Sequence, residues 1–229
     1  SDPGALVSTG SARLSWPGAA FDPAALRGEA DATIRFAPAL PAARVQATAR
    51  PGRWSIRGEQ ALDGGTLAAL ETEIIVDASM FAASSVDGTL LATSGDVVSA
   101  LAELRQGFPA LPDVSTRLAA SPLALDARIS GSIGAPRLVG TARSDRLRIG
   151  GLPSMRATAE FDATTSAVTL SRAWGEDGSG NRVEGHAAFD TGAGTTSGAV
   201  SADMPNLEPL MRALLGAGRA GEPAPKASG

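Results

Sequence analysis

Apolar and polar residues alternate with a period of two along most of this chain, and this pattern restricts the possible folds most strongly. In the segments 123–129, 155–161 and 183–189, the odd-numbered positions are apolar or glycine and the even-numbered positions are mostly polar. Successive side chains of a β-strand point to opposite faces, so each segment predicts a strand with one apolar and one hydrated face. Half-buried strands of this kind are typical of antiparallel sheets. We therefore expect an all-β, mainly antiparallel fold.

Clusters of Gly, Asp, Ser and Thr separate the predicted strands, as hairpin turns require. These clusters lie at 62–65, 85–88, 149–153, 162–167 and 190–198. A further stretch, 175–181, contains three glycines and is interpreted as another hairpin turn, with 182–190 as the returning strand. The chain is thus predicted to be a succession of short hairpins.

Two segments have a helical period instead. The first, 95–108, places Val97, Leu101 and Leu104 on one face and offers Asp96 as an N-cap. The second, 205–218, has the same arrangement with Asn206 as its cap. We expect two short helices.

The two helical segments also resemble copies of each other when the sequence is aligned with itself at one constant shift in residue number. This alignment pairs Gly88 with Gly198 and Asp96 with Asn206. This predicts a first repeat unit of hairpins over 1–108, a second over 109–215, and a flexible tail over 216–229. The alternative is two unrelated short helices in an α+β domain.

Composition excludes several functions. The chain has 229 residues, a net charge of -4, one histidine and no cysteine. An acidic chain lacks the basic face that nucleic acid requires, and the absence of cysteine removes disulfides and thiolate chemistry. No stretch approaches the roughly 20 apolar residues of a transmembrane helix.

Residues that could carry chemistry are few. His186 falls on the polar side of the strand 182–190, so it is predicted to be exposed. Glu176, Asp177, Asn181 and Glu184 lack the spacing of a calcium loop, and the same stretch lacks the third glycine of a dinucleotide loop. We therefore expect no enzyme activity, catalytic residue, metal or cofactor.

One segment carries a more specific pattern. The run "ISGSIGAPRLVGTARSDRLRIGG" at 129–151 is followed by a glycine-rich hairpin. Its pattern residues are Gly131, Ile133, Pro136, Leu138, Gly140, Leu147, Ile149, Gly150, Gly178, Gly180, Val183 and Gly185. Their order resembles the repeats of TamB/AsmA-like cell-envelope proteins over about 129–215.

This resemblance implies an elongated, curved sheet folded around an apolar groove, called a β-taco. It implies a piece of a long protein that is anchored in the inner membrane and spans the periplasm. Family members are associated with phospholipid transport to the outer membrane, and some with outer-membrane protein assembly beside a barrel partner. The expected partners are phospholipid acyl chains, and possible barrel partners belong to the full-length protein; the piece itself is expected to be monomeric.

The predicted groove is the apolar face of the later strands, which the alternation supplies. Its candidate residues are Leu147, Ile149, Met155, Phe161, Val168, Leu170, Val183, Phe189 and Val200. The same residues fit the core of a closed fold equally well. Two other readings therefore stay open: a secreted or surface β-solenoid or sandwich with a structural or adhesive role, and a hydrolase with an unusual site.

Overall fold

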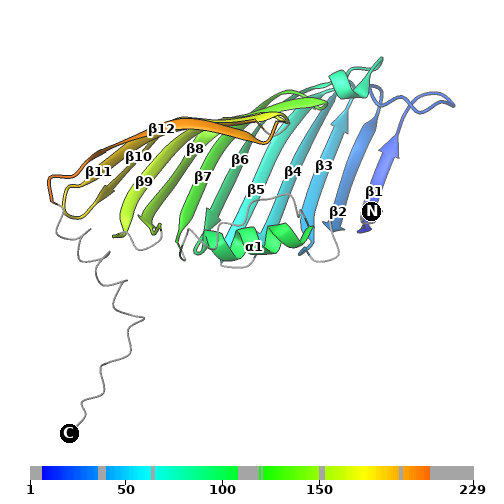
Figure 1. Cartoon of the computed structure of the whole chain (residues 1–229). Coiled ribbons are helices and arrows are strands. Elements are labelled where there is room, and N and C mark those ends of the chain that lie inside the picture. Colours follow the sequence, from blue (N-terminus) through cyan, green and yellow to red (C-terminus); the bar gives the residue numbers. More distant parts are fainter. Residues whose placement is uncertain are drawn as a thin grey trace, which may run out of the picture.

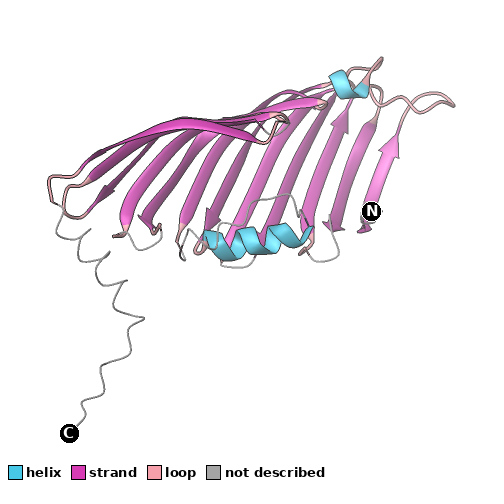
Figure 2. Ribbon diagram, in the orientation of Figure 1, coloured by secondary structure: helices cyan, strands magenta, loops and turns pink. Residues whose placement is uncertain are grey.

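The computed structural model describes residues 7–35, 40–62, 65–107, 119, 121–149, 153–190 and 193–206. Their strands form a single sheet in which every strand pairs antiparallel with the next one along the chain (Figures 1 and 2). The strands are β1 (Val7–Ser15), β2 (Arg27–Arg35), β3 (Ala43–Arg50), β4 (Arg53–Leu62), β5 (Thr66–Ile75), β6 (Ser85–Ser94), β7 (Leu123–Ser132), β8 (Ala135–Leu147), β9 (Met155–Ala163), β10 (Ala167–Asp177), β11 (Arg182–Asp190) and β12 (Thr195–Asp203).

The twelve-stranded sheet is open, because β1 and β12 each have only one neighbouring strand among the described residues. The all-β antiparallel prediction is confirmed. The described sheet is neither a two-sheet sandwich nor a parallel solenoid. The predicted boundary at residue 108 falls between β6 and β7, which pair with each other, so the two predicted units share one sheet. The repeat itself stays a prediction.

The first predicted helix is present as α1 (Val97–Gly107). Asp96 caps it: the Val98 backbone N–H donates to Asp96 Oδ1 at 3.0 Å, and the Ser99 hydroxyl donates to Oδ2 at 2.6 Å. A short 3₁₀ helix, η1 (Phe81–Ala83), lies at the opposite end of the strands from α1 (Figure 2). The second predicted helix, at 205–218, lies outside the described residues from 207 onward.

Some turn predictions were wrong in their bounds. The cluster 85–88 belongs to β6, and the chain reverses before it, at η1. Asp87 instead pairs with Arg128 of β7, while Gly88 lies against Thr72 of β5. The cluster 190–198 contributes Thr195–Gly198 to β12, and β10 continues through 175–177 before its turn. Long-range pairing therefore overrides a local turn signal at these places.

The strand register separates two faces, which we call the inner and the outer face. One row of cross-strand partners crosses the whole sheet on the inner face, and we call it the central row. It consists of Gly10, Ala32, Val45, Gly58, Leu70, Leu90, Ala127, Gly140, Phe161, Leu170, Ala187 and Gly198.

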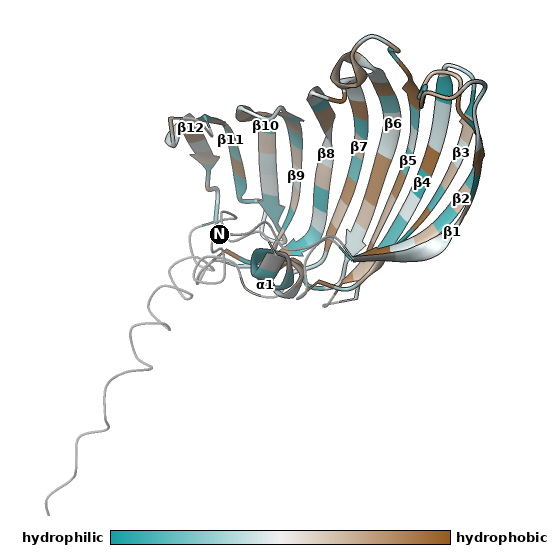
Figure 3. Ribbon diagram, turned by 90° about the vertical axis from the view of Figure 1, so that its right-hand side faces the viewer, coloured by the Kyte–Doolittle hydropathy of each residue, from teal (hydrophilic) through white to brown (hydrophobic). Residues whose placement is uncertain are grey.

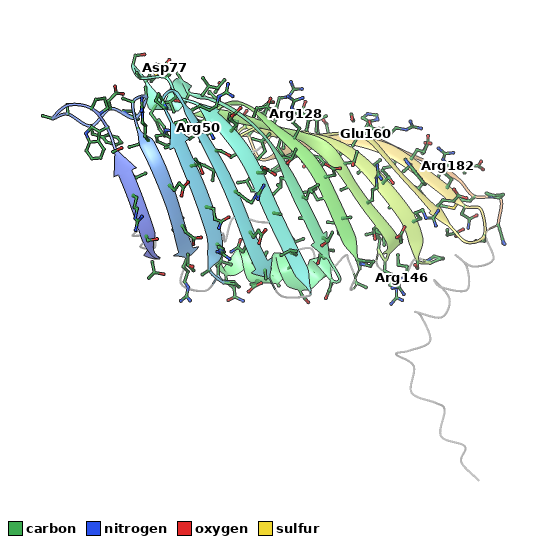
Figure 4. All side chains as sticks on the ribbon, turned by 180° about the vertical axis from the view of Figure 1, so that it is seen from behind. Arg50, Asp77, Arg128, Arg146, Glu160 and Arg182 are labelled. Carbon is green, nitrogen blue, oxygen red and sulfur yellow. The ribbon has the colours of Figure 1, made fainter. Side chains whose placement is uncertain are left out.

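The outer face carries the charges, and ion pairs join neighbouring strands across it (Figure 4). The pairs are Arg44–Asp31, Arg53–Glu73, Arg57–Glu71, Arg128–Asp87, Arg137–Asp162 and Arg156–Asp145. Such solvent-exposed pairs are screened by water and contribute little to stability. Their main consequence is to keep charge on one side of the sheet.

Two bulges preserve this separation where the strict alternation of the sequence fails. In β10 the inward positions change from even to odd between Leu170 and Ala173, and the register with β9 and β11 shifts there. In β8 the same change occurs between Ser144 and Leu147. A bulge inserts an extra residue and re-aims the side chains that follow it. Both bulges thus return apolar residues to the inner face.

The sheet is curved, and α1 lies on its concave side at one end of the strands (Figures 1 and 3). We call this end the lower rim and the end with η1 the upper rim. Inner-face glycines allow close approach between strands: a Cβ at Gly140 would lie 2.2 Å from the Asp126 carbonyl oxygen, and one at Gly88 would lie 2.3 Å from the Glu71 carbonyl oxygen. Glycine in a strand marks such close approaches and bends.

Fully buried apolar residues lie mainly near the two rims. At the upper rim, Ile74 and Val76 are buried, and the Trp54 indole packs on Phe81 and donates to the Pro23 carbonyl at 3.2 Å. At the lower rim, α1 buries Ala100. Most of the inner face between the rims is left half-exposed.

The close contact at Gly140 gives a first prediction. Gly140→Ala should lower the free energy of unfolding by about 2 kcal/mol, as overpacking does, because its Cβ has no space beside the β7 backbone. Gly178→Ala is the matched control, because nothing lies within 4 Å of its Cβ position. Urea unfolding followed by circular dichroism measures both. Equal midpoints for the two variants would contradict the close approach of β7 and β8.

Candidate functional site

The inner face bears an uncharged strip that crosses all twelve strands. Beside the central row runs a second complete row of cross-strand partners. It consists of Ala12, Ala30, Ala47, Ile56, Thr72, Gly88, Ile129, Leu138, Ala163, Val168, Phe189 and Thr196. Neither row contains a charged residue. Figure 3 shows the alternation of hydrophobic and hydrophilic positions along single strands that produces this strip.

This strip is not packed like a core. Of its residues only Gly58, Thr72 and Ala127 are buried, and the others are half-buried or exposed. The exposure increases toward β12, where Phe189 is 41 % exposed and Val200, in an adjoining row, is 77 % exposed. Large contiguous apolar surfaces left open to solvent mark binding sites for proteins, membranes or ligands.

A hollow of about 320 Å³ deepens the inner face over the lower halves of β8–β12. This volume is at the small end of the range for ligand sites. Six of the nine predicted groove residues line it: Leu147, Ile149, Met155, Leu170, Val183 and Val200. The structure therefore brings together residues that the sequence distributes over five strands or strand ends.

The other three predicted residues lie on the same face, toward the upper rim. Phe161 pairs with Leu170 in the central row, and Val168 pairs with Phe189 in the second row. They do not line the hollow but extend its apolar surface. All nine candidates thus belong to one continuous face.

The small residues that give the hollow its depth were missed by the prediction. Ala142, Ala159, Ala173 and Gly185 form consecutive cross-strand pairs and all line the hollow. Their short side chains leave space between the larger residues around them. The signal in the sequence was the recurrence of Ala and Gly at inward positions, which the selection of bulky residues overlooked.

The chemistry-bearing residues of 175–190 include Glu184 and His186, which border the hollow but occupy outward positions of β11. His186 is exposed on the outer face, opposite Val183 and Ala187 in its own strand. Glu184 forms an ion pair with Arg182, whose guanidinium lies 5.9 Å from the centre of the Trp174 ring. No buried carboxylate in the described chain orients His186, so these residues do not form a catalytic arrangement of the Ser-His-acid type.

Asp177 organises the turn between β10 and β11. Its Oδ1 accepts from the Ser179 and Asn181 backbone N–H groups at 2.8 and 3.1 Å, and its Oδ2 accepts from the Asn181 side chain at 2.9 Å. Asn181 is buried and accepts from the Asn206 backbone N–H at 3.0 Å. Partial burial raises the pKa of Asp177, but the hydrogen bonds from Ser179 and Asn181 outweigh it and lower the pKa overall. The carboxylate therefore holds the turn together.

A second hollow, of about 890 Å³, lies over β1–β3. Charged side chains of both signs line it, including Arg13, Glu29, Asp31 and Arg50. Asp31 accepts from Arg44 and Gln46 at 3.2 and 3.0 Å, which lowers its pKa. Because this hollow lies on the hydrated face and is lined by charged residues, whereas the inner hollow is lined mainly by apolar ones, the inner hollow is the better candidate site.

Comparison with protein-family models, curated proteins and solved structures finds no match to this chain. In the described ranges, no group of three or more His, Cys, Asp or Glu side chains is arranged to hold a metal ion. Among the same residues, no helix is long and apolar enough to cross a bilayer. The apolar inner face is consequently the feature on which a functional proposal rests.

The Asp177 turn predicts a pH dependence of stability. The pKa of Asp177 is lowered in the fold from 3.8, so its contribution is complete above about pH 4 and is lost as the pH falls further. Asp177→Ala should therefore destabilise the protein by about 1 kcal/mol at pH 7 and by less at pH 3. Urea unfolding at both pH values measures this difference. Glu176→Ala removes a neighbouring charge without removing the turn hydrogen bonds, and an equal effect of both variants would contradict the assignment.

Proposed function

We propose that this protein holds lipid acyl chains against the inner face of its sheet, without making or breaking a bond. The observation that carries the proposal is the uncharged, incompletely buried strip, which leads into an apolar hollow. A charged ligand would lose free energy of hydration on binding to the strip, whereas a methylene chain gains about 0.8 kcal/mol of binding free energy for each CH₂ group that it buries. The strip offers no charged anchor along its length, so chains of different composition fit it.

The dimensions of the hollow support an acyl chain as the occupant. One leaflet contributes half of a bilayer core that is about 30 Å thick, so an ordered chain spans about 15 Å. The hollow crosses β8–β12, and four strand spacings amount to about 19 Å. One chain therefore fits across these strands.

The segregation of charge supports an open groove over a closed core. Ion-paired side chains keep the outer face hydrated, so the inner face is the one available to an apolar ligand. In the part of the chain that the structure describes, β1 and β12 each lack a second neighbouring strand, which leaves both ends of the strip open there. A chain could thus enter or leave along the strip without unfolding the sheet.

The resemblance to TamB/AsmA-like proteins extends the proposal to a cellular role. On this basis we place the protein in the periplasm, as part of a longer inner-membrane-anchored protein that moves phospholipid toward the outer membrane or supports outer-membrane protein assembly with a barrel partner. The support is the pattern of residues in 129–215 together with the open, curved sheet.

Val200→Asp tests the proposal with little risk to the fold, because Val200 lines the hollow and is 77 % exposed. The variant should weaken binding of a fluorescent fatty acid at least about tenfold, because the bound chain would desolvate the new carboxylate. Titration of the fluorescence change gives the affinity of each protein.

Val139→Asp is the matched control: the same substitution, on the outer face, at a side chain that is 41 % exposed. It should leave the affinity unchanged. If the two variants bind equally well, or if the unsubstituted protein does not bind, the inner face is not an acyl-chain site. Unfolding midpoints of both variants separate lost binding from lost structure.

A further inference from the structure

The lower rim of the hollow carries a concentration of positive charge in an otherwise acidic protein. The six residues 143–148 contain three arginines and one aspartate. They include the β8 bulge, after which Leu147 and Ile149 line the hollow. Arg146 and Arg148 alternate with these two apolar residues, so they do not line the hollow themselves; they lie on the outer side of the chain where it reaches the same rim. Figure 4 shows Arg146 at the lower ends of the strands.

These two arginines are available to a ligand. Both are exposed, and among the described residues neither guanidinium forms an ion pair or a hydrogen bond. The neighbouring Asp145 is 3.6 Å from Arg156 on the outer face. The backbone beside them is fixed, because the Arg148 N–H donates to Ser121 Oγ at 3.1 Å and its carbonyl accepts from the Ala119 N–H at 3.1 Å.

Ser144 gives independent support for a polar ligand group at this rim. It lines the hollow, is only 4 % exposed, and its hydroxyl has no hydrogen-bond partner in the structure. Buried hydroxyl groups are normally paired, since leaving one unpaired costs free energy. Rotation about a single torsion re-aims this hydroxyl.

We propose that this rim is a headgroup site for a phospholipid whose acyl chain occupies the hollow; the proposal rests on the function proposed above. Arg146 and Arg148 bind the anionic phosphate, which arginine recognises through charge-assisted hydrogen bonds. The Ser144 hydroxyl donates to an ester or glycerol oxygen between head and tail. The ligand class is therefore a phosphate-bearing amphiphile, oriented with its head at the lower rim.

The experiment compares two soluble lipids with the same short chains, dioctanoyl-phosphatidylglycerol and dioctanoylglycerol, by titration calorimetry. The phospholipid should bind more tightly, with an advantage that decreases as salt is added. Replacing both arginines (Arg146→Gln with Arg148→Gln) should weaken phosphatidylglycerol binding about tenfold and leave dioctanoylglycerol unchanged.

The matched control is Arg27→Gln with Arg50→Gln, which removes the same net charge from exposed positions at the upper rim. It should bind both lipids as the unsubstituted protein does. Equal binding of the two lipids, or equal effects of the two double variants, would overturn the headgroup site while leaving the acyl-chain groove in place. Binding of neither lipid would overturn the proposed function itself. Inorganic phosphate that bound as tightly as the phospholipid would reveal an anion site unconnected to the groove.

Ser144→Ala supplies a second readout. Removing an unpaired buried hydroxyl should leave the unfolding midpoint unchanged or raise it, yet should weaken phosphatidylglycerol binding about threefold because the hydrogen bond to the lipid is lost. A purely structural serine would show the opposite pattern: lower stability and unchanged affinity.

Discussion

The register of the backbone hydrogen-bond ladders is the constraint on which the rest of this molecule depends. Each strand pairs with the next in sequence, so one set of cross-strand partners runs unbroken from Gly10 to Gly198. A slip of one residue in any pair would exchange the faces of every later strand. It would move Arg128 or Asp162 to the concave side and Leu138 to the convex side. The ion pairs and the apolar strip therefore specify the same register from opposite faces.

Most of the face assignment could be predicted from the sequence, because alternation is a local property of each strand. The inward positions of Met155, Phe161 and Val183 follow from it directly. Alternation fails where the ladder contains a bulge: the two adjacent polar residues Ser171 and Arg172 look like a break in the pattern, yet β10 continues through them. Whether such a break ends a strand or becomes a bulge depends on the two neighbouring strands, which local pattern does not contain.

The candidate site was less predictable than the fold, for a related reason. Bulky apolar residues identify which face is apolar, but the depth of a hollow depends on where neighbouring strands place small residues side by side. Ala142, Ala159, Ala173 and Gly185 come from four strands and become neighbours only through the register. Likewise, nothing local to Ser144 indicates that its hydroxyl lacks a partner. The turn at 85–88 was misassigned because Asp87 and Gly88 resemble turn residues but are held by Arg128 and Thr72 from adjacent strands.

The β8 bulge links the apolar and charged parts of the proposed site. Without the one extra residue between Ser144 and Leu147, strict alternation would turn Leu147 and Ile149 to the outer face and Arg146 and Arg148 to the inner one. Two guanidinium groups would then face an apolar surface, and desolvating their charges would cost a large free energy. With the bulge, the same segment lines the hollow with its apolar residues and leaves its arginines at the rim. An amphiphile requires this pairing of a dry surface with an adjacent charge, and one irregularity of the ladder provides both.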